Sequence, residues 1–99
     1  MAVTINIHYI GAEGNARKFA GEMISRGIVD EIRREEGNLR YEYYLPLEDE
    51  TSILLIDSRE DQAALDRHHR TPMMAQIAEL RKKYGLRMKV ERYIPENNV

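Results

Sequence analysis

Two adjacent histidines stand out among the residues that could do chemistry. The stretch LDRHHRTPMM, residues 65–74, places His68 and His69 just before a threonine–proline pair. Imidazoles can bind a metal ion or act as a catalytic base. Neighbouring side chains on a helix point about 100° apart, so the two rings cannot share one pocket. A two-histidine metal site needs spacing such as i, i+4, so the sequence predicts no metal site here.

His68 is the candidate catalytic residue. It follows Ala64 and Leu65 by four and three residues, on the apolar stripe of a helix predicted over residues 59–70. It is either a core histidine with satisfied ring nitrogens or a general base in a pocket. Burial would favour the neutral form that such a base needs. His69 leaves the stripe and is expected at the surface, so we expect His68→Ala alone to reduce turnover strongly.

Further side chains are candidates for binding a substrate near His68. Tyr41 and Tyr43 share one face of a predicted strand, either as core aromatics or as rings that stack on a flat ligand. Asp57 ends an aliphatic strand, where it could orient His68 or pair with Arg59. Arg59 is itself a candidate residue of the site.

Two more candidates lie elsewhere in the sequence. Asn6 is a polar residue in a strand rich in β-branched residues, which suggests a polar contact. Met73 is either adaptable core or part of a pocket for apolar ligands.

Composition limits the class of protein. The chain has 99 residues, enough for one domain, with 42% hydrophobic and 32% charged residues. A net charge of −2 argues against nucleic-acid or anionic-membrane partners, and the absence of cysteine excludes thiolate chemistry. The N-terminus does not resemble a signal peptide, and the longest aliphatic run, residues 53–56, is too short to span a membrane. We expect a cytoplasmic protein.

Hydrophobic periodicity defines the elements that would position these residues. Strands are predicted over residues 3–10, 39–45, 51–57 and 86–94. Asn15 is predicted to cap the first helix, which Gly27 interrupts and Gly37 ends.

The second helical segment carries its own boundary signals. Residues 58–61, SRED, match a capping box. Proline disfavours helix at the preceding residue, so this helix should split at Thr71–Pro72, with Thr71 capping the second part.

The order βαββαβ predicts an α+β, ferredoxin-like fold with a four-stranded antiparallel sheet and helices on one face. It would occupy residues 1–95 as a single domain, with residues 96–99 as a tail. The opposite face of the sheet mixes tyrosines with polar and charged residues, so we expect a homodimer packed sheet to sheet. Its residues are Asn6, His8, Tyr44, Arg87, Lys89, Glu91 and Tyr93.

Three motifs resemble the antibiotic biosynthesis monooxygenase family, whose relatives include quinol monooxygenases. They are EEGNLRYEYY before the second strand, EDQAALDRH after the third, and the threonine–proline pair. The resemblance covers nearly the whole chain. It implies a dimeric α+β barrel with a pocket between sheet and helices. It also implies oxygenation without a cofactor, in which the anion of a phenol or hydroquinone reduces dioxygen directly.

The sequence departs from the family at several positions. Arg59 stands where relatives commonly carry a tryptophan, Asp57 where they carry glutamate, and Met73 where a histidine often follows the proline. Haem-degrading relatives use an asparagine on the first strand, that tryptophan and a later histidine. Asn6 matches the asparagine, but Ala78 lies near the histidine position, so haem degradation is disfavoured.

The sequence therefore predicts a cofactor-independent monooxygenase, an oxidoreductase that oxidises a small quinol or polyphenol with dioxygen. His68 would be the base, and Tyr41, Tyr43 and Asp57 would shape the pocket. Two alternatives remain open on the same scaffold. One is an isomerase of a small polar metabolite, and the other is a dimer that binds a small molecule without catalysis.

Overall fold

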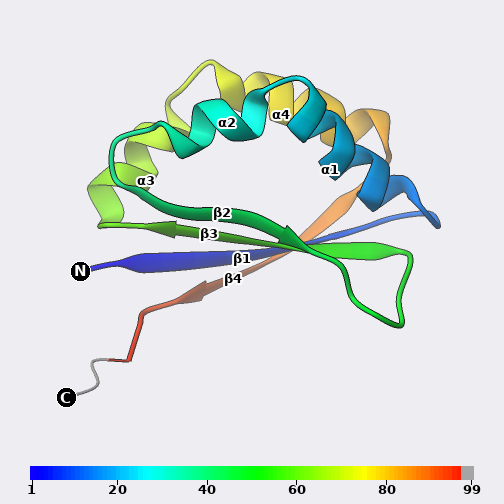
Figure 1. Ribbon diagram of the computed structural model, residues 1–99, viewed down its shortest axis with the longest axis horizontal. Coiled ribbons are helices and arrows are strands. Elements are labelled where there is room, and N and C mark those ends of the chain that lie inside the picture. The colour runs from blue at the N-terminus through cyan, green and yellow to red at the C-terminus, as the bar shows by residue number, and fades with distance from the viewer. Residues whose placement is uncertain (97–99) are drawn as a thin grey trace.

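A four-stranded antiparallel sheet with the strand order β2-β3-β1-β4 carries helices on one face (Figure 1). The computed structural model describes residues 1–96. The predicted ferredoxin-like α+β fold is confirmed, including the split helix at Thr71–Pro72. Of the predicted tail, residues 96–99, all but Glu96 lie outside the described residues. The elements are β1 (Val3–Ile10), α1 (Asn15–Ser25), α2 (Ile28–Arg33), β2 (Asn38–Tyr44), β3 (Ser52–Arg59), α3 (Gln62–His69), α4 (Met73–Lys83) and β4 (Arg87–Tyr93).

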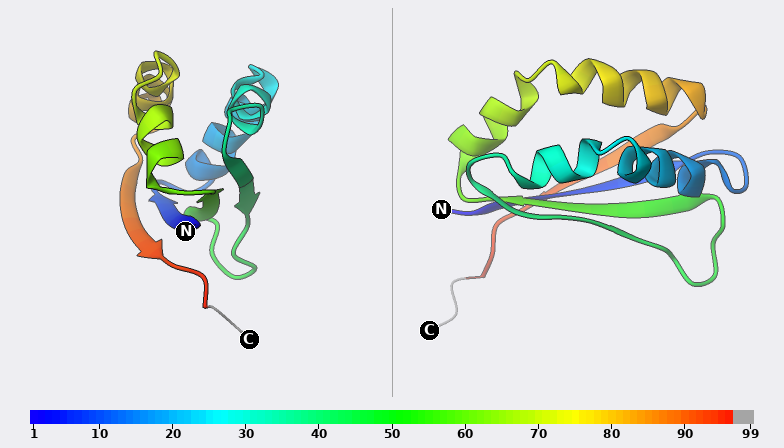
Figure 2. Two further views of the ribbon diagram at one scale, coloured as in Figure 1. Left: turned by 90° about the vertical axis from the view of Figure 1, so that its left-hand side faces the viewer. Right: turned by 45° about the horizontal axis from the view of Figure 1, so that its top comes forward.

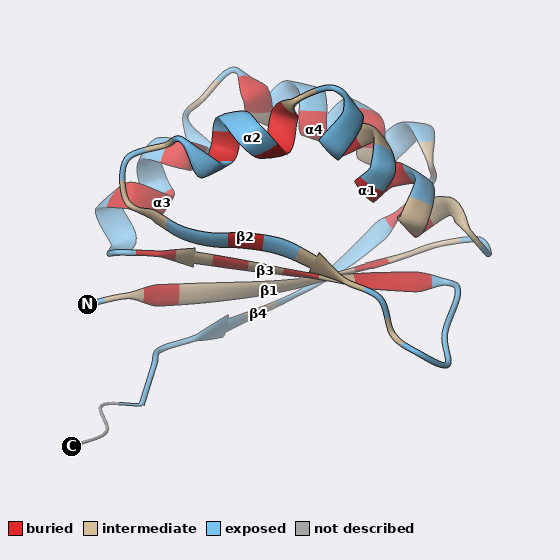
Figure 3. Cartoon of the chain, in the orientation of Figure 1, coloured by how far each residue is buried: buried red, intermediate tan, exposed pale blue. Residues whose placement is uncertain are grey.

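The helices form two rows above the sheet. Figure 2 shows α1 and α2 on the side of edge strand β2, and α3 and α4 on the side of edge strand β4. The buried core lies between the rows and β3, where Phe19, Met23, Ile32, Ile53 and Leu55 are almost fully enclosed (Figure 3). Helix α2 packs beside β2, whereas β4 has β1 as its sole strand neighbour within residues 1–96.

Strand register decides which side chains face the helices. Ile5, Ile7 and Tyr9 of β1 lie opposite Asp57, Leu55 and Ile53 of β3 and opposite Arg92, Val90 and Met88 of β4. Their neighbours in the sequence point to the other face, where the Nε2 atom of His8 lies 2.8 Å from the Oε1 atom of Glu91. The alternation expected from the sequence is therefore present in the sheet.

The three side chains predicted to cap helices, those of Asn15, Ser58 and Thr71, do not cap them. Gly14, in the left-handed region with φ 82°, precedes α1, and the Asn15 side chain donates instead to the carbonyl of Tyr84 at 3.2 Å. Asp61, not Ser58, caps α3 by accepting from the backbone N–H of Ala64 at 2.8 Å.

Ser58 does not cap α3 because it lies within β3, which continues to Arg59. The Ser58 hydroxyl lies 2.8 Å from the Thr4 hydroxyl. Thr71 also serves another role. Its hydroxyl donates to the carbonyl of His68 at 2.9 Å, which closes the end of α3, while Pro72 precedes α4.

Two glycines fix the path of the chain. Gly27, with φ 76°, separates α1 from α2 as the sequence predicts. Helix α2 ends at Arg33, before Gly37, which has φ 87° in the turn that enters β2. A Cβ atom at Gly37 would lie 2.5 Å from the Cβ atom of Ala64, so α3 packs directly on this turn.

Within residues 1–96, no helix has the length and apolar character needed to cross a bilayer.

Candidate functional site

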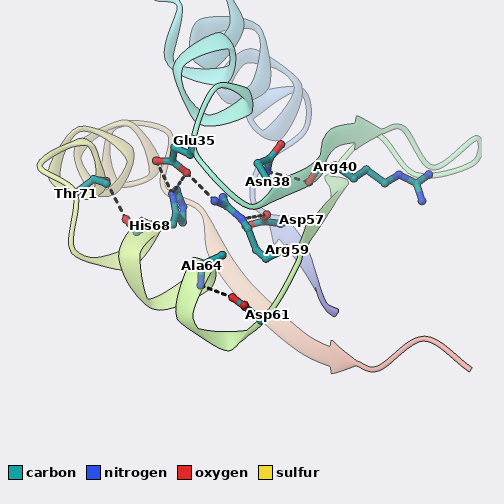
Figure 4. Close-up of polar contacts among 9 residues, drawn as sticks. All are labelled: Glu35, Asn38, Arg40, Asp57, Arg59, Asp61, Ala64, His68 and Thr71. Carbon is teal, nitrogen blue, oxygen red and sulfur yellow. Dashed lines mark hydrogen bonds and ion pairs between the residues drawn. The ribbon is translucent and has the colours of Figure 1, made fainter. Parts of the chain in front are cut away.

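A buried ion network joins the end of β3 to the turn after α2 (Figure 4). The Arg59 side chain is 0% exposed. Its Nε atom donates to Asp57 Oδ1 at 2.8 Å, and its Nη1 atom donates to Glu35 Oε1 at 2.7 Å. Burial lowers the pKa of Arg59, but the bonds to Asp57 and Glu35 outweigh it, so the net shift is upward. Of the two partners that the sequence offered for Asp57, the structure shows Arg59.

His68 joins this network from α3. The ring is buried, with 5% of the residue exposed, and its Nδ1 atom lies 2.9 Å from Glu35 Oε1. An ionised carboxylate only accepts hydrogen bonds, so Nδ1 carries the proton and Nε2 is the basic atom of the neutral ring. Burial is the main cause that lowers the pKa of His68, with a smaller contribution from the charge of Arg59, against the opposing bond to Glu35. The ring is therefore neutral at neutral pH.

A mainly apolar cavity lies elsewhere, between the α3–α4 row and strands β1 and β4. Its volume is about 570 Å³, within the range of about 300–1,000 Å³ typical of small-molecule sites. Aliphatic and methionine side chains make most of its wall, and His69, Gln62, Arg81 and Arg92 contribute polar groups. The apolar side chains are Ile5, Ile7, Leu65, Met74, Ile77, Ala78, Met88 and Val90.

The two histidines of the opening motif face different spaces. His69 is exposed, as predicted, and it also lines the 570 Å³ cavity. His68 lines a smaller hollow of about 220 Å³ with Glu35, Arg67 and Thr71. A hollow of that volume is below the range typical of ligand sites. The structure thus separates the predicted base, His68, from the 570 Å³ cavity.

The predicted tyrosines lie deeper in the core. The rings of Tyr41 and Tyr43 meet edge to face with centroids 5.9 Å apart, and Tyr41 is 2% exposed. Burial raises the pKa of both hydroxyls. The Tyr43 hydroxyl is buried without a hydrogen-bond partner among the described residues. Neither tyrosine lines the 570 Å³ cavity.

The remaining predicted site residues are dispersed. Asn6 lies on the sheet face away from the helices, where its Oδ1 atom is buried without a partner among residues 1–96. Met73 belongs to the core, whereas its neighbour Met74 lines the cavity. Among the described residues, no three histidine, aspartate or glutamate side chains are grouped so that they could hold a metal ion.

Several cavity residues were not among the sequence-predicted candidates. Tyr9 lines the cavity, and burial raises the pKa of its hydroxyl to about 12, although the charge of Arg81 opposes this. A signal for the arginines is present in the sequence. Arg81 follows Ile77 by one helical turn, and Arg92 continues the alternation of Met88 and Val90. Glu35 carries no such signal, because it lies in an irregular turn 33 positions from His68.

Comparisons with known proteins agree with this architecture. SnoaB, a cofactor-independent oxygenase from Streptomyces nogalater, has a TM-score of 0.80 at 14% identity over 99% of this chain and 96% of that chain. PA3566 from Pseudomonas aeruginosa has a TM-score of 0.77 at 25% identity over 95% and 93%. Rv0793 from Mycobacterium tuberculosis has a TM-score of 0.73 at 20% identity over 99% and 98%.

Among curated proteins, none matches this chain. The sequence model of the antibiotic biosynthesis monooxygenase family matches residues 2–80, most of the chain. This match and the shared fold lead to one assignment: the chain belongs to the antibiotic biosynthesis monooxygenase family.

Proposed function

We propose that this protein is a cofactor-independent monooxygenase that oxidises a small quinol or polyphenol with dioxygen. The observation that carries the proposal is the 570 Å³ apolar cavity with an imidazole in its wall. Apolar walls of this kind can pack against a planar aromatic ring, and the imidazole supplies a group that can accept a phenolic proton. The family membership supports the same reaction class.

The proposed reaction balances without any further reactant. The base removes a phenolic proton, and the resulting anion gives one electron to dioxygen. The superoxide and the substrate radical then combine to form a carbon–oxygen bond, and the resulting peroxide anion takes the proton back from the base to give a hydroperoxide. Loss of water breaks the oxygen–oxygen bond and removes the hydrogen from the same ring carbon. A hydroquinone and dioxygen thus give a hydroxyquinone and water.

The geometry favours His69 as the base, because its side chain borders the cavity and that of His68 borders the smaller hollow. In this assignment His68 holds α3 against Glu35, and Arg59 and Asp57 complete that anchor. The positive charge of the cavity wall, from Arg81 and Arg92, favours the substrate anion over its neutral form, since a cation near developing negative charge lowers the barrier.

We also propose that the protein is a homodimer through the sheet face opposite the helices. Asn6 contributes an unpartnered buried oxygen to that face, and Tyr93 is 48% exposed on it. Aromatic and polar side chains of this kind suit a partner surface better than bulk water.

The test is dioxygen consumption with a panel of hydroquinones, compared between two matched substitutions on α4. Both Ala78 and Ala75 are exposed on α4, but Ala78 lines the cavity and Ala75 does not. Ala78→Phe should fill the cavity and abolish turnover, and Ala75→Phe should leave it unchanged. Ligand-induced stabilisation without dioxygen uptake would instead make the protein a non-catalytic binding dimer. Conversion of a small polar metabolite without dioxygen would make it an isomerase.

A further inference from the structure

The cavity wall carries positive charge and no acidic group. Its polar residues are Arg81, Arg92, His69 and Gln62, and among the described residues no aspartate or glutamate lines it. The composition does not explain this, because the chain has 17 acidic residues against 15 lysines and arginines. The absence of acidic residues from the cavity wall is therefore a feature of this site and does not follow from the overall composition of the protein.

The two cavity arginines also lack acidic partners. Within residues 1–96, neither Arg81 nor Arg92 makes an ion pair, whereas the interior Arg59 makes two. Unpaired guanidinium groups beside an apolar surface are costly unless a solvent molecule or an anion compensates them. Arg92 is exposed to solvent and borders a neighbouring hollow together with Asp61, so Arg81, which is half-buried, is the guanidinium with charge to offer a ligand.

Arg81 is placed to meet such a ligand. It extends from α4 toward β4, where its Nη1 atom lies 3.1 Å from the sulfur of Met88. Arg81 is half-buried, and Arg92 is exposed. Met88 and Arg92 are four residues apart on β4, roughly 13 Å, so the two arginines lie toward opposite ends of the cavity. A less hydrated charge interacts more strongly, which favours Arg81 as the main contact.

We propose that the cavity takes an aromatic substrate that carries an anionic group, such as a hydroxylated aromatic carboxylate, with Arg81 as the partner of that anion. A guanidinium binds a carboxylate with two parallel hydrogen bonds, which fixes the orientation of the ring as well as its position. Arg92 adds positive charge at the exposed end and accelerates capture of the anion. The identity of the substrate class rests on the proposed oxygenase function, but the preference for an anion does not.

The experiment compares two probes of similar size, 2,5-dihydroxybenzoate and the neutral 2,5-dihydroxybenzamide. Binding is measured by calorimetry without dioxygen, so the result does not depend on turnover. The benzoate should bind at least about tenfold more tightly than the amide, a difference of about 1.4 kcal/mol. Arg81→Met should remove this preference, and Arg92→Gln should reduce it to a smaller extent.

Arg34→Met is the matched control, because Arg34 is an exposed arginine at the end of α2 that lies outside both the cavity and the free face of the sheet. It should leave the preference intact. Equal binding of the two probes to the unaltered protein would overturn the proposal, as would an equal loss in Arg34→Met.

A salt series on the unaltered protein covers the case in which Arg81→Met does not fold. Benzoate affinity should fall between about 0.02 M and about 0.5 M salt while amide affinity stays constant. A benzoate affinity that does not change with salt would reject the charged contact. Dioxygen uptake is a separate measurement, so a confirmed anion preference without uptake would contradict the oxygenase function alone.

Discussion

At the scale of residues, the two adjacent histidines have different surroundings. The ring of His68 is enclosed with Glu35 and Arg59, and that of His69 borders the apolar cavity. The roughly 100° between neighbouring positions of α3 produces this difference. The assignment of a base therefore depends on which side of the helix meets the cavity, not on which side is more buried.

The same pair provides a direct test of the base. Because a general base contributes about 10²- to 10⁴-fold, His69→Ala should lower kcat by at least about 100-fold. His68→Ala should reduce turnover chiefly through lower stability. Steady-state dioxygen uptake, with thermal unfolding of both variants as the control, separates the two effects. A fully folded His68→Ala protein without activity, beside an active His69→Ala protein, would return the base assignment to His68.

The lowered pKa of His68 makes stability depend on pH. Above its ordinary value of 6.5, the ring is neutral in both the folded and the unfolded chain. As the pH falls below about 6.5, the unfolded chain binds a proton that the folded chain resists, so the free energy of unfolding decreases. Urea unfolding across this range should show a loss that His68→Gln reduces and His69→Gln does not. An unchanged slope in His68→Gln would contradict the burial of a neutral ring.

At the scale of elements, the contact between the turn before β2 and α3 positions the ion network. A Cβ atom at Gly37 would meet Ala64, whereas at Gly27 it would meet nothing within 4 Å, although both glycines have positive φ. Gly27→Ala should therefore cost about 1–2 kcal/mol through backbone strain alone. Gly37→Ala should cost about 1–3 kcal/mol more through the clash. Chemical denaturation measures both, and equal losses would mean that α3 moves away freely.

Short-range patterns predicted most of this fold and little of the site. Period-two alternation placed Asp57 on the side of β3 that carries Ile53 and Leu55, and Gly27 marked the break after α1. The prediction for Arg59 is wrong: it was expected to open the next helix, but it extends β3, and α3 begins only at Gln62. The caps failed because Asn15 and Thr71 each had another acceptor within reach. The resemblance implied a pocket between sheet and helices, but the residues that line it and the role of Glu35 were not predictable, since they depend on how α3 packs against distant segments.

At the scale of the whole molecule, the free face of the sheet governs assembly. Ile56 lies on that face opposite Asn6 and Glu42, whereas Ile24 is exposed on α1. We expect the protein to sediment as a dimer at micromolar concentration and Ile56→Arg to produce monomers, because a charge buried in an interface lacks a partner. Ile24→Arg is the matched control and should leave the dimer intact. A monomeric unaltered protein would reject the proposed assembly.

The position of β4 at the margin of the sheet has a consequence for how ligands exchange. This strand forms one wall of the cavity and bonds to β1 along a single side. Strands with one neighbour fray at lower free energy than strands held on both sides. The β4 side chains of that wall already meet solvent, with Met88 42% and Val90 55% exposed, so a brief peeling of β4 would widen the entrance while β3 and the packed helices stay in place. Ligands could then enter and leave along this edge of the sheet without unfolding of the core.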